Sequence, residues 1–294
     1  MSVLVDLETR VVVQGITGRQ AAWSTADLVD YGTKVVAGVV PGKGGQEHAG
    51  IPIFNHVDEA VRATSANAAL TYVPARLATE AIGEALDAGL RLIVYPGDGL
   101  PMHDAYRLRV QAQRQGSTLV GPNTPGVISP GQAKLGFMPS FCYSPGHVGV
   151  VTKSGSLSYE VCRRLTQAAI GQSTVVGIGG DPIKGATMRE VLDLFHDDDA
   201  TAGIVVLGEI GGMDEYDVCS YAERAEAKPV VAFLVGKTAP ENRKLGHASA
   251  LVDTKGAGYA AKVSALRQSG VPVAEAFPEL VVMTRDRIVG GMAR

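Results

Sequence analysis

The sequence lacks the features of several broad classes of protein. Its three cysteines, Cys142, Cys162 and Cys219, are an odd set without the spacing of a metal site, which fits reduced thiols in a cytosol. No apolar run reaches the roughly 18 residues that a membrane span needs. The first residues, MSVLVDLETR, lack the basic, apolar and small-residue pattern of a signal peptide. We therefore expect a cytoplasmic protein that does not associate with a membrane.

The sequence also has a small net charge and few aromatic residues. The net charge is −3, without a basic block, so the sequence gives no reason to expect nucleic acid as a partner. Aromatic residues make up 5% of the chain, whereas hydrophobic residues make up 46% and glycine occurs 36 times. A chain of 294 residues with this composition can bury a sizeable core in one large domain or two ordinary ones.

Short β-branched runs alternate with segments of helical period along the first 120 residues. Strands are predicted at RVVVQG, KVVAGVVPG, AALTYVPA, LRLIVYPG and STLVGPN. Helices are predicted at Ala21 to Gly32, Val57 to Thr64, Ala75 to Ala88 and Pro101 to Gln115. This alternation is typical of a parallel, doubly wound sheet.

A second α/β unit follows a segment that breaks this rhythm. Residues 121–146 contain five prolines and little periodicity, and we interpret them as a connector whose first part is also a candidate lining of a site. Strands then recur at HVGVVTKSG, STVVGIGGD, AGIVVLGEIGG, KPVVAFLVG and VPVAEAF, with helices from about Ser156 and near Thr187 to His196. We predict an α/β protein of two domains, residues 1–125 and residues 126–294, the second of flavodoxin type.

The turn after the first strand is related to a nucleotide-binding loop. Gly15-x-x-Gly18-x-x-Ala21 lies between a strand and a helix, where backbone N–H groups can approach phosphate oxygens. The second strand leads into a glycine-rich turn with Lys43, where NAD-binding proteins carry an acidic residue. Lys43 is either a phosphate ligand or a solvated surface charge. Arg19 is either a second cation for the same anion or an exposed residue at the helix start.

Two further loops end strands of the second unit. Ser154-Gly155 precedes a helix, where serine acts as an N-cap or the helix end binds an anion. Glu209, in GEIGG, is either an ordinary salt-bridge partner or a carboxylate that holds a histidine by hydrogen bond.

His247 lies in GHASA among residues with very small side chains. The other histidines are scattered without metal-ligand spacing, and no G-x-S-x-G nucleophile motif is present. His247 is therefore a loop histidine, a core histidine, or a nucleophile that accepts a transferable group. A helix N-terminus at Ser154-Gly155 would favour a phosphoryl group there.

Taken in order, these motifs resemble one family. QGITG, PGKGGQEHAGIPIFN, GPNTPGVISPG, KSGSLSYE, GIGGDPI, GEIGG and GHASA are similar to loops of the succinyl-CoA synthetase α subunit, along essentially the whole chain. The resemblance implies a Rossmann-type CoA-binding domain followed by a flavodoxin-like domain that carries a phosphohistidine. It also implies a β subunit with an ATP-grasp domain, in a heterodimer or heterotetramer.

The resemblance implies roles for individual residues. His247 would be phosphorylated, Glu209 would orient it, Ser154-Gly155 would hold the phosphoryl group, and Tyr159 would touch the carboxylate substrate. The residues implied to lie along CoA are Thr17, Gly18, Arg19, Gln20, Lys43, Pro96, Gly97 and Asp98.

The implied reaction joins a small carboxylic acid to CoA in three steps. ATP or GTP, bound with Mg²⁺ on the partner, phosphorylates His247; the phosphoryl group passes to the carboxylate; and the CoA thiol attacks the acyl phosphate. This chain departs from the family pattern at Ala21, Asp98, Thr124 and Ser249. Malate or citrate therefore remain alternatives to succinate, and the rival functions are a non-catalytic CoA-binding subunit, an NAD(P)-dependent oxidoreductase and a CoA-transferase.

Overall fold

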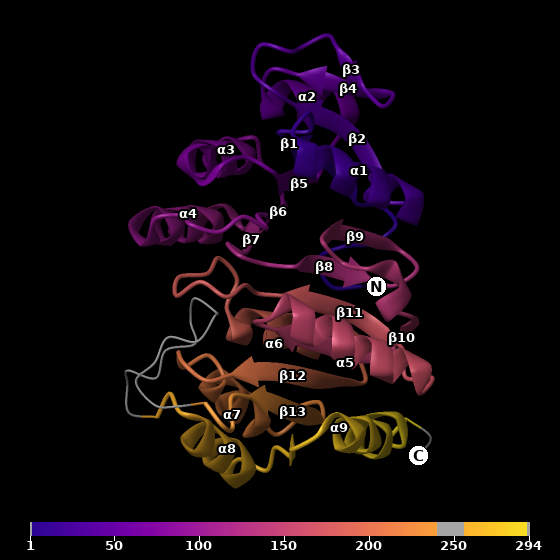
Figure 1. Cartoon of the computed structure of the whole chain (residues 1–294), viewed down its shortest axis with the longest axis vertical. Helices are drawn as coiled ribbons and strands as arrows, with labels where there is room; N and C mark the ends of the chain where they lie inside the picture. Colours follow the sequence, from indigo (N-terminus) through magenta and orange to yellow (C-terminus); the bar gives the residue numbers. More distant parts are fainter. Residues whose placement is uncertain (1, 240–255, 293–294) are drawn as a thin grey trace.

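The computed structural model describes residues 2–239 and 256–292, which fold around two seven-stranded sheets (Figure 1). The first sheet contains β1 (Arg10–Gln14), β2 (Lys34–Val39), β3 (Glu47–His48), β4 (Ile51–Phe54), β5 (Ala68–Thr71), β6 (Leu92–Val94) and β7 (Thr118–Val120). Its helices are α1 (Arg19–Tyr31), α2 (Val57–Thr64), α3 (Ala75–Asp87) and α4 (Met102–Gln115). These bounds agree with the predicted helices to within two residues at each end.

The strand order of the first sheet confirms a Rossmann-type fold. The order is β3-β4-β2-β1-β5-β6-β7, and all pairs except β3 with β4 are parallel. Without the short β3, this is the 3-2-1-4-5-6 order of dinucleotide-binding sheets. The order reverses between β1 and β5, and ligands bind such sheets at that point, beyond the carboxyl ends of the strands.

The second sheet has the flavodoxin-like order among its parallel strands. Its strands are β8 (Gly126–Ser129), β9 (Ala133–Gly136), β10 (Pro145–Thr152), β11 (Gln172–Gly177), β12 (Gly203–Glu209), β13 (Val230–Val235) and β14 (Val273–Ala274). The order is β14-β13-β12-β10-β11-β8-β9, so β10 to β14 follow the 2-1-3-4-5 pattern. The helices are α5 (Gly155–Gln167), α6 (Met188–Asp197), α7 (Tyr216–Ala222), α8 (Tyr259–Gln268) and α9 (Phe277–Thr284).

Residues 121–146, interpreted from the sequence as a connector with little periodicity, contain regular structure that the sequence did not predict. Strands β8 and β9 form an antiparallel hairpin, and β8 extends the second sheet by pairing antiparallel with β11. A 3₁₀ turn, Ser140–Cys142, follows the hairpin. The strands are buried on both faces, so they lack the alternation of polar and apolar residues that marks a half-exposed strand.

The hairpin also joins the two halves of the molecule. The buried Lys134 ammonium on β9 lies 2.7 Å from the Asp27 carboxylate on α1. The Asn123 amide donates to the Asp181 carboxylate across the same junction, at 3.0 Å. Near the N-terminus, which lies beside the hairpin in Figure 1, the Val3 N–H donates to the Thr174 hydroxyl on β11. The two sheets are therefore tied together at several points.

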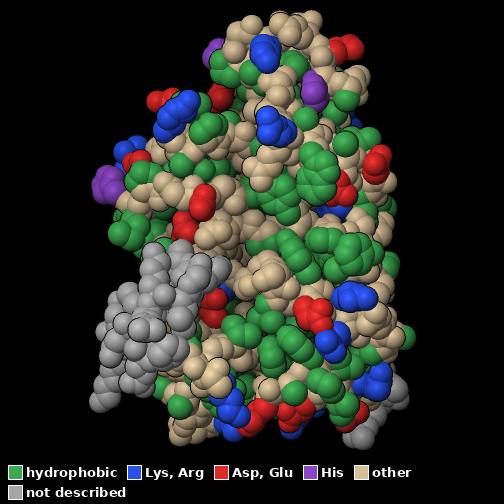
Figure 2. Space-filling model, viewed as in Figure 1, with side chains coloured by type: hydrophobic (Ala, Val, Ile, Leu, Met, Phe, Trp, Pro, Cys, Tyr) green, Lys and Arg blue, Asp and Glu red, His purple; other side chains and the backbone are tan. Residues whose placement is uncertain are grey.

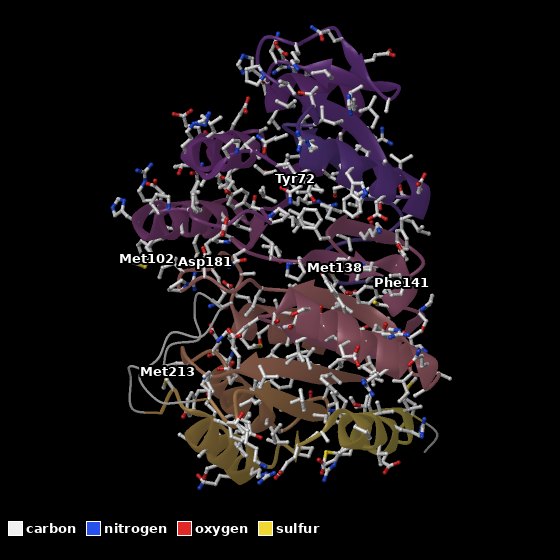
Figure 3. All side chains as sticks on the ribbon, in the orientation of Figure 1. Tyr72, Met102, Met138, Phe141, Asp181 and Met213 are labelled. Carbon is white, nitrogen blue, oxygen red and sulfur yellow. The ribbon has the colours of Figure 1, made fainter. Side chains whose placement is uncertain are left out.

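Aromatic side chains collect at this junction. Trp23 on α1 stacks on Phe137, with ring centroids 6.4 Å apart, and Phe137 also contacts Tyr72 at 5.4 Å. Tyr72 and Met138, labelled in Figure 3, lie on the two sides of the junction. Hydrophobic side chains gather at this level on the face shown in Figure 2. Trp23 and Phe141 are 65% and 76% exposed. None of the helices in the described part of the chain has the length and hydrophobicity to cross a membrane.

Candidate active site

A pocket lies at the point where the strand order of the first sheet reverses. Gly15 follows β1 with φ +78°, and a Cβ atom there would lie 2.3 Å from the Tyr72 carbonyl oxygen, so only glycine fits. The turn then enters α1, and the residues at the start of this helix line the pocket. The pocket has a volume of about 500 Å³. Its lining residues include Gly18, Arg19, Gln20, Ala21, Tyr72, Pro96, Gly97, Asp98, Asn123 and Phe137.

The structure thus brings together most of the residues predicted to lie along CoA. Gly18, Arg19 and Gln20 come from the start of α1, and Pro96-Gly97-Asp98 follow β6. Between these segments, the phenol of Tyr95 is buried, and burial together with the nearby Asp98 and Asp181 carboxylates raises its pKa. The pocket also has a wall that the sequence did not predict, because Phe137 reaches it from the hairpin.

Lys43 and Thr17 lie beside each other at the edge of this site. The Lys43 ammonium donates to the Thr17 hydroxyl at 3.1 Å. The turn that carries Lys43 is fixed by Asn55, whose side-chain oxygen accepts the N–H groups of Gly42 and Gly44 at 2.9 and 3.0 Å. The structure therefore places an exposed cation next to the glycine loop, as expected for an anion site.

Two departures from the family pattern have local explanations. Ala21 is 1% exposed and packs in the core beneath α1, so a methyl group is accommodated where the nucleotide loop usually has a third glycine. The Thr124 hydroxyl donates to the Gly177 carbonyl at 2.5 Å and accepts the Gly126 N–H at 2.9 Å. Thr124 therefore links the hairpin to the end of β11.

In the second sheet, Ser154 occupies the N-cap position of α5. Its hydroxyl makes no capping hydrogen bond to the helix, and it lies 3.5 Å from the Ser156 hydroxyl. The Ser154 backbone is held instead by Thr152, whose hydroxyl accepts the Ser154 N–H at 3.0 Å. The two serine hydroxyls and the helix N-terminus thus form a polar end that suits an anion.

Tyr159 lies one turn into α5, on the side that faces the hairpin. Its hydroxyl donates to the Phe137 carbonyl. Burial, together with the nearby Cys142 thiol, raises the pKa of Tyr159 to about 12. Phe137 lines the pocket of the first half, so Tyr159 connects α5 to the wall of that pocket.

Glu209 is the last residue of β12, at the point where the strand order of the second sheet reverses. It is 5% exposed, and its carboxylate lies 3.7 Å from the buried Lys153 ammonium on the neighbouring strand end. Lys153 was missed by the sequence analysis, although a lysine between a buried strand and a helix start in VVTKSG signals a buried charge that needs partners.

Lys153 belongs to a cluster of buried charges that sequence reasoning did not find. Its ammonium lies 3.2 Å from Asp214 and 3.4 Å from Glu215. Asp214 also pairs with Lys184 at 3.2 Å, and Glu215 pairs with Lys262. Burial opposes the charge on Lys153, but the surrounding carboxylates outweigh it and raise the pKa of this lysine. Ion pairing therefore favours the charged form of Lys153, whereas burial lowers the pKa of Lys262 although Glu215 lies beside it.

His247 lies outside the described residues, so the structure does not test its predicted role. The chain is described again from Gly256, whose carbonyl accepts the Tyr216 hydroxyl at 2.8 Å. The next carbonyl, that of Ala257, accepts the Gly211 N–H at 2.9 Å. Gly256 and Ala257 are therefore attached to the first residue of α7 and to the loop that follows Glu209.

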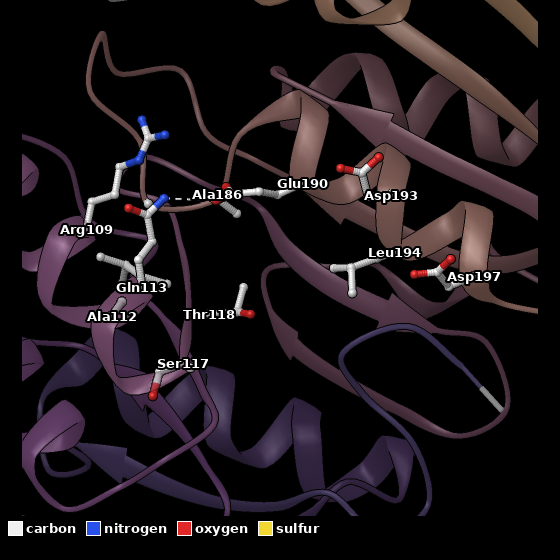
Figure 4. A pocket seen from close by; sticks show the side chains of 13 residues that line it. Arg109, Ala112, Gln113, Ser117, Thr118, Ala186, Glu190, Asp193, Leu194 and Asp197 are labelled. Atoms are coloured by element: carbon white, nitrogen blue, oxygen red, sulfur yellow. Dashed lines mark hydrogen bonds between the residues drawn. The ribbon is translucent and has the colours of Figure 1, made fainter. Parts of the chain in front are cut away.

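Another pocket, of about 350 Å³, lies between α4 and α6 (Figure 4). Arg109 and Gln113 line it from α4, and Glu190 and Asp193 from α6. It borders the beginning of β7, at Thr118, and so lies at the amino end of the strand. Because α/β sheets bind ligands at the carboxyl ends of their strands, we do not assign the active site to this pocket.

Among the described residues, no group of three or more His, Cys, Asp or Glu could hold a metal ion.

Comparison with known proteins defines the class of protein to which this site belongs. Residues 6–96 match the family described as CoA binding domain, and residues 151–272 match the family described as CoA-ligase. The first match covers the glycine loop, Lys43 and Pro96, and the second covers Lys153 to Glu209 and the histidine loop. The fold and its two sites thus define a CoA ligase with two α/β domains.

The family itself is shown by relatives that match nearly the whole chain. The chain is 48% identical over 285 residues to succinate–CoA ligase [ADP-forming] subunit alpha 1 of Archaeoglobus fulgidus, covering 97% of this chain and 98% of that protein. It is 47% identical to the corresponding α subunit of Aquifex aeolicus, covering 94% and 91%. The chain belongs to the family of succinate–CoA ligase α subunits.

A solved structure supports the same fold. ATP citrate lyase from Methanothrix soehngenii, in complex with citrate and coenzyme A, matches with a TM-score of 0.89 and 26% identity. The match covers 99% of this chain and 51% of that chain, so this protein spans about half the length of the lyase.

Proposed function

We propose that this protein is the α subunit of an ADP-forming succinate–CoA ligase. The observation that carries the proposal is the presence of two sites at strand ends. One is the pocket with Gly18, Arg19 and Asp98 in the first half, and the other is Glu209, whose carboxylate lies 3.7 Å from the ammonium of Lys153, the residue before Ser154. The near-complete match to relatives with this name supports the reaction and the substrate. The domains extend over residues 1–125 and 126–294.

In the first domain, CoA lies along the pocket. Backbone N–H groups of Thr17, Gly18, Arg19 and Gln20 receive its phosphates, and Lys43 adds a positive charge. Pro96-Gly97-Asp98 form the opposite wall. The pocket volume, the helix N-terminus and the cation beside Thr17 support this assignment.

In the second domain, His247 carries the phosphoryl group between substrates. A ring nitrogen attacks the γ-phosphorus of the nucleotide, the P–O bond to ADP breaks, and a P–N bond forms. Glu209 orients the imidazole, and Ser154-Gly155 at the helix end hold the phosphoryl oxygens. The carboxylate substrate, positioned by Tyr159, then attacks the phosphorus. The P–N bond breaks, the imidazole of His247 leaves as the neutral ring, and an acyl phosphate forms. The CoA thiolate attacks the acyl carbon and releases inorganic phosphate.

The nucleotide is held by a β subunit, in a heterodimer or heterotetramer. We assign ATP with Mg²⁺ to an ATP-grasp domain of that partner, since the relatives are named ADP-forming. Within the described part of this chain, neither pocket has a metal-binding group of acidic or histidine ligands. The reaction takes place in the cytoplasm.

The proposal is tested on the chain purified with its encoded partner. Incubation with γ-labelled ATP should place acid-labile, alkali-stable label on the peptide that contains His247, and His247→Ala should abolish both label and turnover while retaining CoA binding. The label should leave upon addition of CoA with succinate, and not with malate or citrate.

Other outcomes separate the alternatives. Release of the label with citrate or malate would keep the ligase chemistry and replace the substrate. A complex that binds CoA and takes no label from ATP or GTP would be a CoA-binding subunit without phosphoryl transfer.

A further inference from the structure

The buried charge cluster of the second domain surrounds the backbone on either side of Glu209. The Glu209 N–H donates to the Glu215 carboxylate at 3.1 Å. On the other side, the Glu209 carbonyl accepts the Lys262 ammonium at 2.8 Å. Glu209 is therefore fixed through its main chain by two side chains that come from the loop before α7 and from α8.

The next residues of the loop are fixed by the same groups. The Gly211 carbonyl accepts Lys262 at 2.7 Å and Lys153 at 3.2 Å. Lys262 donates its third hydrogen bond to Glu215, so its three ammonium protons have three acceptors. Two lysines and one carboxylate thus determine the course of the chain from Glu209 to Gly211.

Gly208 leaves room for the side chain of Glu215. A Cβ atom at Gly208 would lie 2.7 Å from Cγ of Glu215, so glycine at this position lets the glutamate lie beneath the strand end. Lys262 and Glu215 are each 1% exposed. Burying an ammonium and a carboxylate costs free energy that apolar residues of similar volume would avoid. Besides its bond to Glu215, Lys262 donates to the backbone carbonyls of Glu209 and Gly211. A buried ion pair with these two bonds is suited to fixing the loop after Glu209.

We propose that Lys262 and Glu215 are positioning residues that hold the backbone of Glu209, and thereby direct its carboxylate into the active site. This inference rests on the proposed role of Glu209 in catalysis. Neither Lys262 nor Glu215 is assigned a contact with substrate or nucleotide. They act through the main chain of residues 209–211, which also anchors Ala257 after the histidine loop.

A double-mutant cycle tests the inference on the chain purified with its partner. Lys262→Met should lower the rate of acyl-CoA formation by about 100-fold, since misplacement of a catalytic group by an ångström has an effect of that size. The KM for CoA should change by less than about twofold, because the CoA pocket lies in the other domain. Glu209→Gln should also lower the rate. If Lys262 acts through Glu209, the double variant should be no more than about twofold slower than the slower single variant.

Two further variants control for the effect of an unpaired buried charge and for the loss of a carboxylate elsewhere in the domain. Glu215→Gln/Lys262→Met removes both charges together and keeps an acceptor for the Glu209 N–H; it should fold and show the same loss of rate. Glu275→Gln removes a carboxylate from an exposed ion pair with Lys237 in the same domain, and should leave the rate unchanged.

The outcomes distinguish this inference from the proposed function. Rate losses that multiply in the double variant would overturn the inference, as would full activity of the charge-free pair variant. Wild-type complex that forms acyl-CoA but takes no phosphate label would overturn the phosphohistidine mechanism, and the cycle on acyl-CoA formation would still decide the role of Lys262.

Discussion

Lys43 is an exposed cation whose ammonium and turn make hydrogen bonds to residues of two other loops. Thr17 lies 3.1 Å from its ammonium, and Asn55 fixes the turn on both sides through Gly42 and Gly44. An ammonium held in place loses less conformational freedom when it binds an anion than a free surface lysine does. Its contribution to CoA binding should therefore be measurable although it is exposed.

We predict that Lys43→Met weakens CoA binding by about tenfold, equivalent to about 1.4 kcal/mol. The effect should shrink at high salt, because exposed charges are screened. Titration calorimetry of the complex with CoA at two salt concentrations would measure it. Lys34→Met is the matched control, since Lys34 lies at the other end of β2 and pairs with Glu8. Equal affinities of the Lys43 variant and wild type would contradict the assigned site.

Asp214 shows how burial and ion pairing compete at one residue. Burial alone would raise the pKa of its carboxyl group, but Lys184 and Lys153 outweigh burial and hold the pKa below the ordinary value. A carboxylate with a lowered folded-state pKa stabilises the protein above its unfolded pKa of about 3.9, and this stabilisation is lost as the pH falls through the folded value.

We predict that Asp214→Asn is less stable than wild type by about 3 kcal/mol at pH 7, since it removes a carboxylate that pairs with two buried ammonium groups, those of Lys153 and Lys184. The difference should be constant above about pH 5 and should shrink as the pH falls below about 4, since Asp214 takes up a proton there in the unfolded chain and only at lower pH in the folded protein. Urea denaturation at several pH values would measure the difference. Asp30→Asn, at an exposed carboxylate on α1, is the control and should match wild type throughout. A difference in the free energy of unfolding that grows as the pH falls would contradict the ion pairing assigned to Asp214.

At the scale of elements, α6 has a complete capping box. The Thr187 hydroxyl accepts the Glu190 N–H at 3.2 Å, and the Glu190 carboxylate accepts the Thr187 N–H at 2.8 Å. The sequence predicts a helix near Thr187 to His196, and in the structure the helix begins at Met188, with Thr187 as its N-cap. The cap fixes the helix start because it satisfies N–H groups that have no partner within the helix.

We predict that Thr187→Ala destabilises the protein by about 1 kcal/mol, whereas Thr187→Ser, which keeps the hydroxyl, stays within a few tenths of a kcal/mol of wild type. Urea midpoints at neutral pH would compare the three proteins. Equal losses in both variants would point to the methyl group of Thr187 rather than to its hydroxyl.

At the scale of the whole molecule, the hairpin makes one site depend on both halves. Phe137 follows β9 of the second sheet, yet it lines the pocket of the first and stacks on Trp23. Trp23 is the single tryptophan of the chain and is largely exposed. Because Trp23 stacks on Phe137, its fluorescence should respond to a ligand that contacts Phe137 in the pocket.

We predict that CoA changes the emission of Trp23 in a saturable way, with a midpoint equal to the dissociation constant from calorimetry. Phe137→Leu should bind CoA and show a much smaller change, because the stacking partner is lost. The measurement applies to a complex whose partner tryptophans have been replaced. Unaltered Trp23 emission at saturating CoA would place the ligand away from Phe137.

The sequence by itself determined the fold class, the two strand series and most helix positions. Parallel strands buried on both faces are continuous apolar runs, and the glycine turns after them mark the strand ends where sites form. The loops around Gly18, Ser154 and Glu209 were found because each follows such a run, and the order of the motifs was sufficient to find the family.

Tertiary structure decided what depends on residues far apart in the chain. The β8–β9 hairpin was missed because its strands are buried on both faces and lack alternation, and Phe137 becomes part of the CoA pocket only through the contact between the two sheets. Lys153, Glu215 and Lys262 are separated by up to about a hundred positions, and no local pattern pairs them. Their charges are compatible with burial only because the fold brings each ammonium to a carboxylate and to the carbonyls after Glu209.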